Sequence, residues 1–159
     1  MNRINAMKEI KKHIQSFKYI HKKEFLKIDL WNLTFQMDIG LPEIQMTIKF
    51  NESFLDVLVF PHPIIVNDNN FYDLLRIINY INWNLKGLGR LYIDDYRDLA
   101  YSLRIKYDFL EKMPEFTLGE LEFAIDIYSD LFKTIFDISE GEISYDDGKR
   151  QIELIWKID

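Results

Sequence analysis

The chain has 159 residues, enough to bury about two-thirds of its unfolded surface in a single domain. Its 48% hydrophobic and 15% aromatic content excludes a disordered chain, and its net charge of −6 argues against nucleic acid and anionic membranes as partners. It contains no cysteine and no run of ~18 apolar residues, so we expect no disulfide, no thiolate metal site and no membrane span. These features predict one cytoplasmic domain spanning residues 1–159.

The N-terminal segment predicts an amphipathic helix of about four or five turns. Its apolar residues recur at three- and four-residue spacing, and most of its lysines fall between them. The apolar set is Ile4, Met7, Ile10, Ile14 and Phe17.

Residues 26–39 alternate between apolar and polar side chains, with one change of parity at Trp31-Asn32. A β-bulge at that point would keep both apolar sets on one face of a single strand, because one extra residue reverses the pleat. A turn between two short strands is the alternative. The first apolar set is Leu26, Ile28 and Leu30, and the second is Leu33, Phe35, Met37 and Ile39.

Two further strands follow. Residues 44–50 alternate strictly, which predicts one buried and one wet face. Residues 54–60 (FLDVLVF) are apolar on both parities, so we expect this strand inside the sheet. Pro61, His62 and Pro63 then end it, because proline has no amide to donate to a neighbouring strand.

A second helix begins at the potential N-caps Asp68, Asn69 and Asn70 and ends at Gly87 or Gly89. Its buried face would carry Phe71, Leu74, Leu75, Ile78, Ile81 and Leu85.

Three asparagines interrupt this helix. At ~100° per residue, Asn82 projects into the middle of the buried face and Asn79 onto its flank, whereas Asn84 points away. The structural interpretation is that Asn82 bonds to the backbone of a neighbouring strand or loop and fixes how the helix docks. The functional interpretation is a polar group in a pocket. We favour the structural one, because no histidine or carboxylate lies at helical spacing from Asn82.

Residues 90–94 and 99–107 predict a hairpin that turns at residues 95–98. Thr117 and Glu120 form a capping box for a long helix that runs to about Ser139 and stops at Gly141. After it, Asp147-Gly148 predicts a turn, and residues 142–158 a strand or hairpin. That last strand would place Ile152, Leu154, Trp156 and Ile158 on one face.

The order α-β-β-β-α-β-β-α, with a C-terminal strand or hairpin added, predicts an α+β fold. We expect a mainly antiparallel five-stranded sheet with the helices packed on one face. Residues 4–139 would form the core of the domain, and residues 142–158 an extension.

One part of the chain resembles the bacterial YbjN-like family. The resemblance is carried by Asn79 and Asn82, by the run GRLYIDD at residues 89–95, and by the strand that begins at Leu99. That family has the type III secretion chaperone-like fold, with a similar order of elements. The resemblance implies a small acidic protein that dimerises and binds other proteins, and it implies no enzyme. Residues 152–158 (IELIWKI) have no counterpart in the family's pattern.

The long last helix is apolar over an arc of roughly 220°, about twice the ~100° expected of a surface helix. Either the first helix or the C-terminal strand covers the second edge of this arc, or that edge is an interface with a client or a second copy. The resemblance favours the interface. The first edge is Leu121, Ile125, Tyr128, Phe132 and Ile135, and the second is Phe123, Ile127, Leu131 and Ile138.

The residues that carry enzyme chemistry do not form a recognisable set. His13, His21 and His62 lack the spacing of metal ligands, and the sequence has no phosphate-binding glycine loop or nucleophile elbow. We therefore predict a non-enzymatic bacterial protein-binding module, chaperone-like or adaptor-like, that forms a homodimer and needs no cofactor or metal. Its partner-binding residues would be Phe123, Ile127, Leu131 and Ile138, with Tyr72 and Trp83 as aromatic anchors. The alternative is a small-ligand or metal-sensing regulatory domain, with a pocket near Asn79, Asn82 and the Asp94–Asp98 hairpin.

Overall fold

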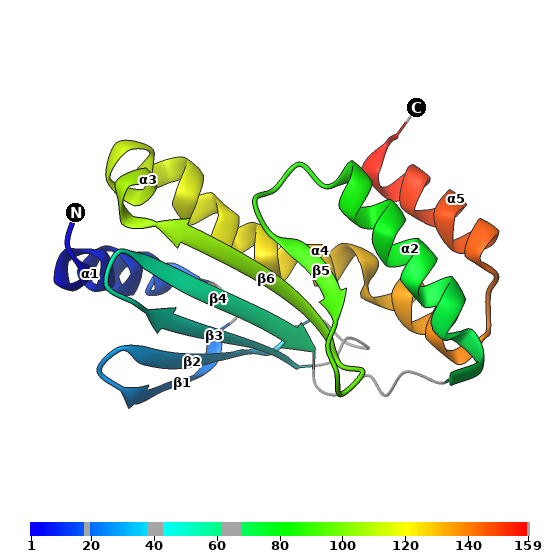
Figure 1. Ribbon diagram of the computed structural model, residues 1–159, viewed down its shortest axis with the longest axis horizontal. Helices are drawn as coiled ribbons and strands as arrows, with labels where there is room; N and C mark the ends of the chain where they lie inside the picture. Colours follow the sequence, from blue (N-terminus) through cyan, green and yellow to red (C-terminus); the bar gives the residue numbers. More distant parts are fainter. Residues whose placement is uncertain (18–19, 38–42, 62–67, 159) are drawn as a thin grey trace.

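The computed structural model describes residues 1–17, 20–37, 43–61 and 68–158. It confirms the α+β class, because the described residues form one antiparallel sheet with helices packed against it (Figure 1). The strand order is β1-β2-β3-β4-β6-β5. The strands are β1 (Ile20–Lys27), β2 (Leu30–Phe35), β3 (Ile44–Phe50), β4 (Phe54–Pro61), β5 (Arg90–Ile93) and β6 (Leu99–Lys106). The helices are α1 (Arg3–Ile14), α2 (Phe71–Asn84), α3 (Tyr107–Lys112), α4 (Pro114–Glu140) and α5 (Tyr145–Trp156), and the short 3-10 helix η1 (Asp68–Asn70) leads into α2.

Strand register gives the sheet one core face. Trp31, Ile48, Val57 and Leu103 form a single row across four strands, and all four side chains are buried. Helices α1 and α4 lie behind the sheet in Figure 1 and cover this face. The predicted alternation of β3 and the interior position of β4 are both confirmed, since β4 pairs with β3 on one side and β6 on the other.

The alternation in residues 26–39 belongs to two strands, so the prediction of one bulged strand is wrong. β1 and β2 are joined by a tight turn at residues 28–29, which makes six strands where five were predicted. The alternative of a turn between two short strands is therefore correct, although the turn comes earlier than Trp31. Leu26 and Ile28 were predicted to face the core, but they are 58% and 82% exposed beside this turn. Residue Ile39, like His62 and Pro63, lies outside the described residues.

The C-terminal segment is helix α5, so the predicted strand or hairpin is wrong. Ser144 caps the helix by accepting a hydrogen bond from the Asp147 amide, and acidic residues in the first turn favour the helix N-terminus. Gly148 is not a turn residue. It lies within α5, where a Cβ atom would overlap the side chain of Ile138 on α4. The period-2 pattern is coincidental, since Ile152 is fully buried and Leu154 is 80% exposed.

Helix α4 begins one turn before the predicted capping box, with Pro114 at its first position. Thr117 is inside the helix and donates its hydroxyl to the carbonyls of Met113 and Pro114. The capping-box prediction is therefore wrong. The predicted stop at Gly141 is confirmed by its left-handed φ of 75°, which glycine adopts without strain.

The β5–β6 hairpin is confirmed, although β6 ends one residue earlier than predicted. Tyr107 leaves the sheet and begins the short helix α3, which no pattern in the sequence predicted.

Helices α2 and α5 lie side by side at the end of the molecule opposite α1 and α3, next to the second half of α4 (Figure 1). This three-helix arrangement positions the candidate sites.

Candidate functional site

The second apolar edge of α4 belongs to the core of the monomer. Ile127, Leu131 and Ile138 are each no more than 1% exposed, and Phe123 is half-buried. Helices α2 and α5 pack against α4 and cover this edge. The assignment of Ile127, Leu131 and Ile138 to a partner surface is therefore wrong, whereas Phe123 is only partly covered. The alternative account, in which the C-terminal segment covers the edge, is correct, although that segment is a helix.

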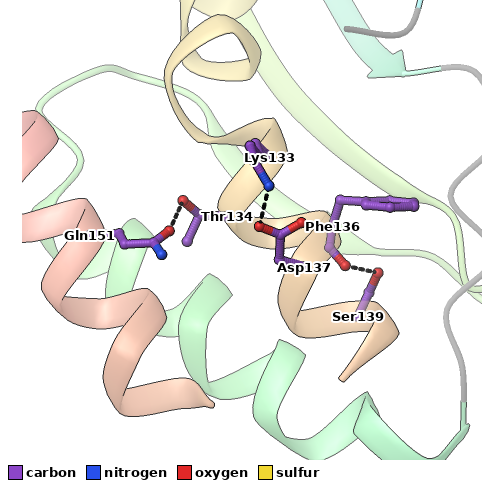
Figure 2. Close-up of polar contacts among 6 residues, drawn as sticks. All are labelled: Lys133, Thr134, Phe136, Asp137, Ser139 and Gln151. Atoms are coloured by element: carbon purple, nitrogen blue, oxygen red, sulfur yellow. Dashed lines mark hydrogen bonds and ion pairs between the residues drawn. The ribbon is translucent and has the colours of Figure 1, made fainter. Parts of the chain in front are cut away.

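Polar side chains accompany this packing in the last turns of α4. Thr134 donates to Gln151 Oε1 of α5 at 2.9 Å, and Lys133 Nζ lies 2.6 Å from Asp137 Oδ2. Figure 2 shows how these side chains face one another. The hydrogen bond from Lys133 to Asp137 raises the pKa of the lysine. Ser139 is fully buried and donates its hydroxyl to a carbonyl within the helix. The buried oxygens drawn here already have partners, so this cluster serves packing rather than chemistry.

Tyr72 and Trp83 are on the surface. Trp83 is 89% exposed and Tyr72 is 73% exposed, on the side of α2 that faces away from α4. Leu75, Arg76 and Asn79 lie between them and are also exposed. We call these five residues the outer face of α2.

Asn82 pairs with the backbone of a strand, as the structural interpretation expects. Its amide nitrogen donates to the Leu91 carbonyl at 2.8 Å, and its Oδ1 accepts from the Leu91 amide at 2.9 Å. The side chain therefore occupies the position of a neighbouring strand along the free edge of β5. Asn79 is exposed, and Asn84 donates to the Tyr80 carbonyl one turn back.

Asn82 and Asp94 of the predicted ligand pocket are engaged in local structure. Asp94 Oδ1 accepts from the amides of Tyr96 and Asp98, both at 2.9 Å, and so closes the hairpin turn. Arg97 in the same turn forms an ion pair with Asp68 of η1, the 3-10 helix that leads into α2. These contacts fix the hairpin against α2.

A cleft with a volume of about 450 Å³ lies at the opposite end of α2. Residues 84–86 at the end of α2, Phe123 of α4 and residues 156–158 at the end of α5 line it. This volume is within the range of small-molecule sites. We call it the α2–α5 cleft. Its residues come from the ends of α2 and α5 and from α4, and Phe123 is the only one of them that was predicted as a binding residue, as part of a partner surface.

The loop behind Phe123 is held by buried polar side chains. The Leu88 amide donates to Glu120 Oε2 at 2.7 Å, and the Gly89 amide donates to the Tyr101 hydroxyl at 3.1 Å. Burial and the nearby Glu120 carboxylate raise the pKa of Tyr101 to about 12. The tyrosine is thus neutral at physiological pH. A Cβ on Gly89 would overlap its ring, so glycine permits this contact.

Neither a metal-ion site nor a membrane-spanning helix is found among the described residues. No group of three or more His, Cys, Asp or Glu side chains there is arranged to hold a metal ion. His13 Nε2 lies 3.3 Å from Glu122 Oε1, with no hydrogen-bond geometry to it. The described helices include none that is long and apolar enough to cross a membrane.

Three carboxylates lie one turn apart along the exposed side of α4. Partial desolvation raises the pKa of Asp126, and the charges of Asp130 and Glu122 raise it further. The Asp126 carboxyl therefore binds its proton more tightly in the folded chain than in the unfolded chain. Ionised Asp126 thus destabilises the fold at neutral pH. The destabilisation is lost as the pH falls through the pKa of the folded state.

Asp126→Asn is expected to raise the melting temperature at pH 7 by about 1–2 °C, because it removes two like-charge contacts. The gain should shrink as the pH falls towards the ordinary aspartate pKa of 3.8. Thermal melts from about pH 8 to about pH 4 measure it. Asp95→Asn in the hairpin turn changes the net charge equally and is the control. A gain that stays constant over this range would contradict the assignment.

The sequence matches no protein-family model, and a search of curated proteins finds no match either. The resemblance to the YbjN-like family therefore stays a prediction.

Proposed function

We propose that the chain is a non-enzymatic protein-binding module that forms a homodimer through the outer face of α2. The observation that carries the proposal is the 89% exposure of Trp83 on a well-formed helix. Tryptophan, tyrosine and arginine are the residues most enriched where protein interfaces bind most strongly. All three types occur on this face, as Trp83, Tyr72 and Arg76.

The spacing of the two aromatic residues suits a two-fold contact between copies. Tyr72 and Trp83 are eleven positions apart on one side of the helix, a rise of roughly 16 Å at 1.5 Å per residue. A two-fold axis passing near Arg76 and Asn79 would make the two α2 helices antiparallel. Each Trp83 would then lie against Tyr72 of the other copy, which is the self-complementary pairing that an isologous dimer requires.

Charge also favours this face. The chain carries a net charge of −6, so two copies repel each other over most of their surfaces. Helix α2 contains a single acidic and a single basic residue, and these two, Asp73 and Arg76, form an ion pair at 3.2 Å. The guanidinium also lies 3.7 Å from the centroid of the Tyr145 ring, which holds Arg76 in place. Helix α2 therefore carries no net side-chain charge to oppose the approach of a second copy.

The resemblance to the YbjN-like family supports the same class of function. It implies a small acidic bacterial protein that dimerises and binds other proteins, which fits a chaperone-like or adaptor-like role. The location of the dimer contact on α2 is our own proposal, because the α4 edge that first suggested an interface is buried.

Trp83→Glu tests the proposal. We expect the wild-type chain to be dimeric at micromolar concentration and the variant to dissociate at least about 30-fold more readily, because an interface anchor contributes 2 kcal/mol or more. Analytical ultracentrifugation measures both. The side chain is exposed in the monomer, so circular dichroism should show an unchanged fold.

Tyr96→Glu is the matched control, because Tyr96 is 88% exposed in the β5–β6 turn and does not belong to the outer face of α2. It should dimerise like the wild type. A monomeric wild-type chain, or equal loss of the dimer in both variants, would contradict a contact through α2.

A further inference from the structure

We propose that the α2–α5 cleft binds a small organic anion with a flat apolar body, such as an aromatic carboxylate. The site is separate from the outer face of α2 and does not depend on dimerisation. Its walls, its cations and its position between helix ends each contribute to the inference.

The walls of the cleft are mainly apolar, with Asn84 as an additional polar residue, and they are partly preformed. Phe123 and Trp156 supply aromatic rings, and Leu85 and Ile158 supply aliphatic surface. The ring of Phe123 is positioned by an edge-to-face contact with Tyr101, with centroids 6.4 Å apart, and by Gly87, which has no side chain to push it aside. Aromatic walls of this kind bind flat apolar molecules, and a preformed wall lowers the entropic cost of binding.

Two ammonium groups are available at the cleft. Lys86 and Lys157 line it, both are exposed, and neither has an ion-pair partner among the residues that the structure describes. Lys157 also has a left-handed backbone, with φ of 50°, at a helix end where glycine is favoured. Lysine thus occupies a backbone position at which glycine would be the less strained residue. These groups select an anion over a neutral molecule.

The two lysines could instead serve only to neutralise the C-terminal ends of the two helices. Helices α2 and α5 both end at the cleft, and the free carbonyl groups of a helix C-terminus favour nearby cations. Lysines that only neutralise the helix ends would affect stability and would leave binding unchanged. Ligands with one body and different charges distinguish the two roles.

Two fluorescent probes provide the test. 8-Anilinonaphthalene-1-sulfonate is an anion, and N-phenyl-1-naphthylamine has the same aromatic body without the sulfonate. We expect the wild-type chain to bind one molecule of the anion and to bind the neutral probe about fivefold more weakly. In the variant Lys86→Gln/Lys157→Gln, the affinity for the anion should fall about fivefold and that for the neutral probe should stay unchanged.

Lys12→Gln/Lys112→Gln is the control for net charge, because both lysines are exposed and belong to α1 and α3, at the opposite end of the molecule from α2 and α5 (Figure 1). This control should bind the anion like the wild type. Equal affinity for the two probes, an unchanged affinity in the Lys86/Lys157 variant, or a loss in the Lys12/Lys112 control would overturn the proposal.

Discussion

Leu131→Asp is expected to unfold the chain rather than to yield a folded monomer. Leu131 is fully buried between α4 and the helices packed on it, and its immediate surroundings are apolar. Burying an unpaired carboxylate there, or opening the packing to admit water, should cost at least about 4 kcal/mol of the free energy of unfolding. Urea titration followed by circular dichroism measures this loss. Ile127→Asp, at 1% exposure, should behave in the same way.

Ser129→Asp is the matched control, because it adds the same charge to an exposed position of the same helix. It should change the free energy of unfolding by no more than about 0.5 kcal/mol. A well-folded Leu131→Asp chain that had lost only a partner would show that the second apolar edge of α4 is an interface after all. The experiment therefore separates a core role from a binding role at one residue.

The wide apolar arc of α4 indicated a second contact of this helix but not which residues make it. Its excess width is real, and it does mark a second contact made by this helix. The pattern on α4 alone could not identify the partner, because the covering residues lie in other parts of the chain. Ile127 and Leu131 would look the same whether a second molecule or α5 covered them.

The error at the C-terminus has a specific cause. The Asp147-Gly148 pair and the alternating Ile152, Leu154, Trp156 and Ile158 fit a hairpin, and the same residues also fit a helix. The helical signal was the Ser144 cap followed by acidic residues. Gly148, a poor helix former, is used here because the α4 side chain of Ile138 comes too close for any larger residue. That tertiary requirement cannot be deduced from local propensity.

The α2–α5 cleft could not have been predicted from a motif. Its lining comes from chain segments around residues 85, 123 and 157, which meet only because α2 and α5 end side by side. The one local signal is a lysine just after the end of each helix. Lysine at such positions is common, so the pattern by itself indicates no ligand.

Removing the two hydrogen bonds of Asn82 is expected to have the second large effect on the free energy of unfolding. Asn82→Leu keeps the approximate size of the side chain and removes both bonds, which leaves the Leu91 amide and carbonyl without these partners. Leu91 is 2% exposed, so water cannot easily replace them. We expect a loss of about 2–4 kcal/mol in the free energy of unfolding. Urea titration gives the total, and hydrogen exchange at the Leu91 amide should accelerate more than at other β5 amides.

Asn82→Asp gives a finer test of the same contact. The carboxylate can still accept from the Leu91 amide, but its second oxygen would face the Leu91 carbonyl where the amide nitrogen now donates at 2.8 Å. Replacing a donor by an acceptor makes that contact repulsive, so Asn82→Asp should be destabilised although it keeps one of the two bonds.

Asn79→Ala is the control, because Asn79 is exposed on the same helix; it should change stability by no more than about 0.5 kcal/mol. Wild-type stability in Asn82→Leu, with unchanged exchange at Leu91, would return Asn82 to the functional interpretation. The expected result explains why an amide side chain interrupts this apolar helix. Asparagine and glutamine alone offer the donor and acceptor pair of a peptide group, which the free edge of β5 needs from α2.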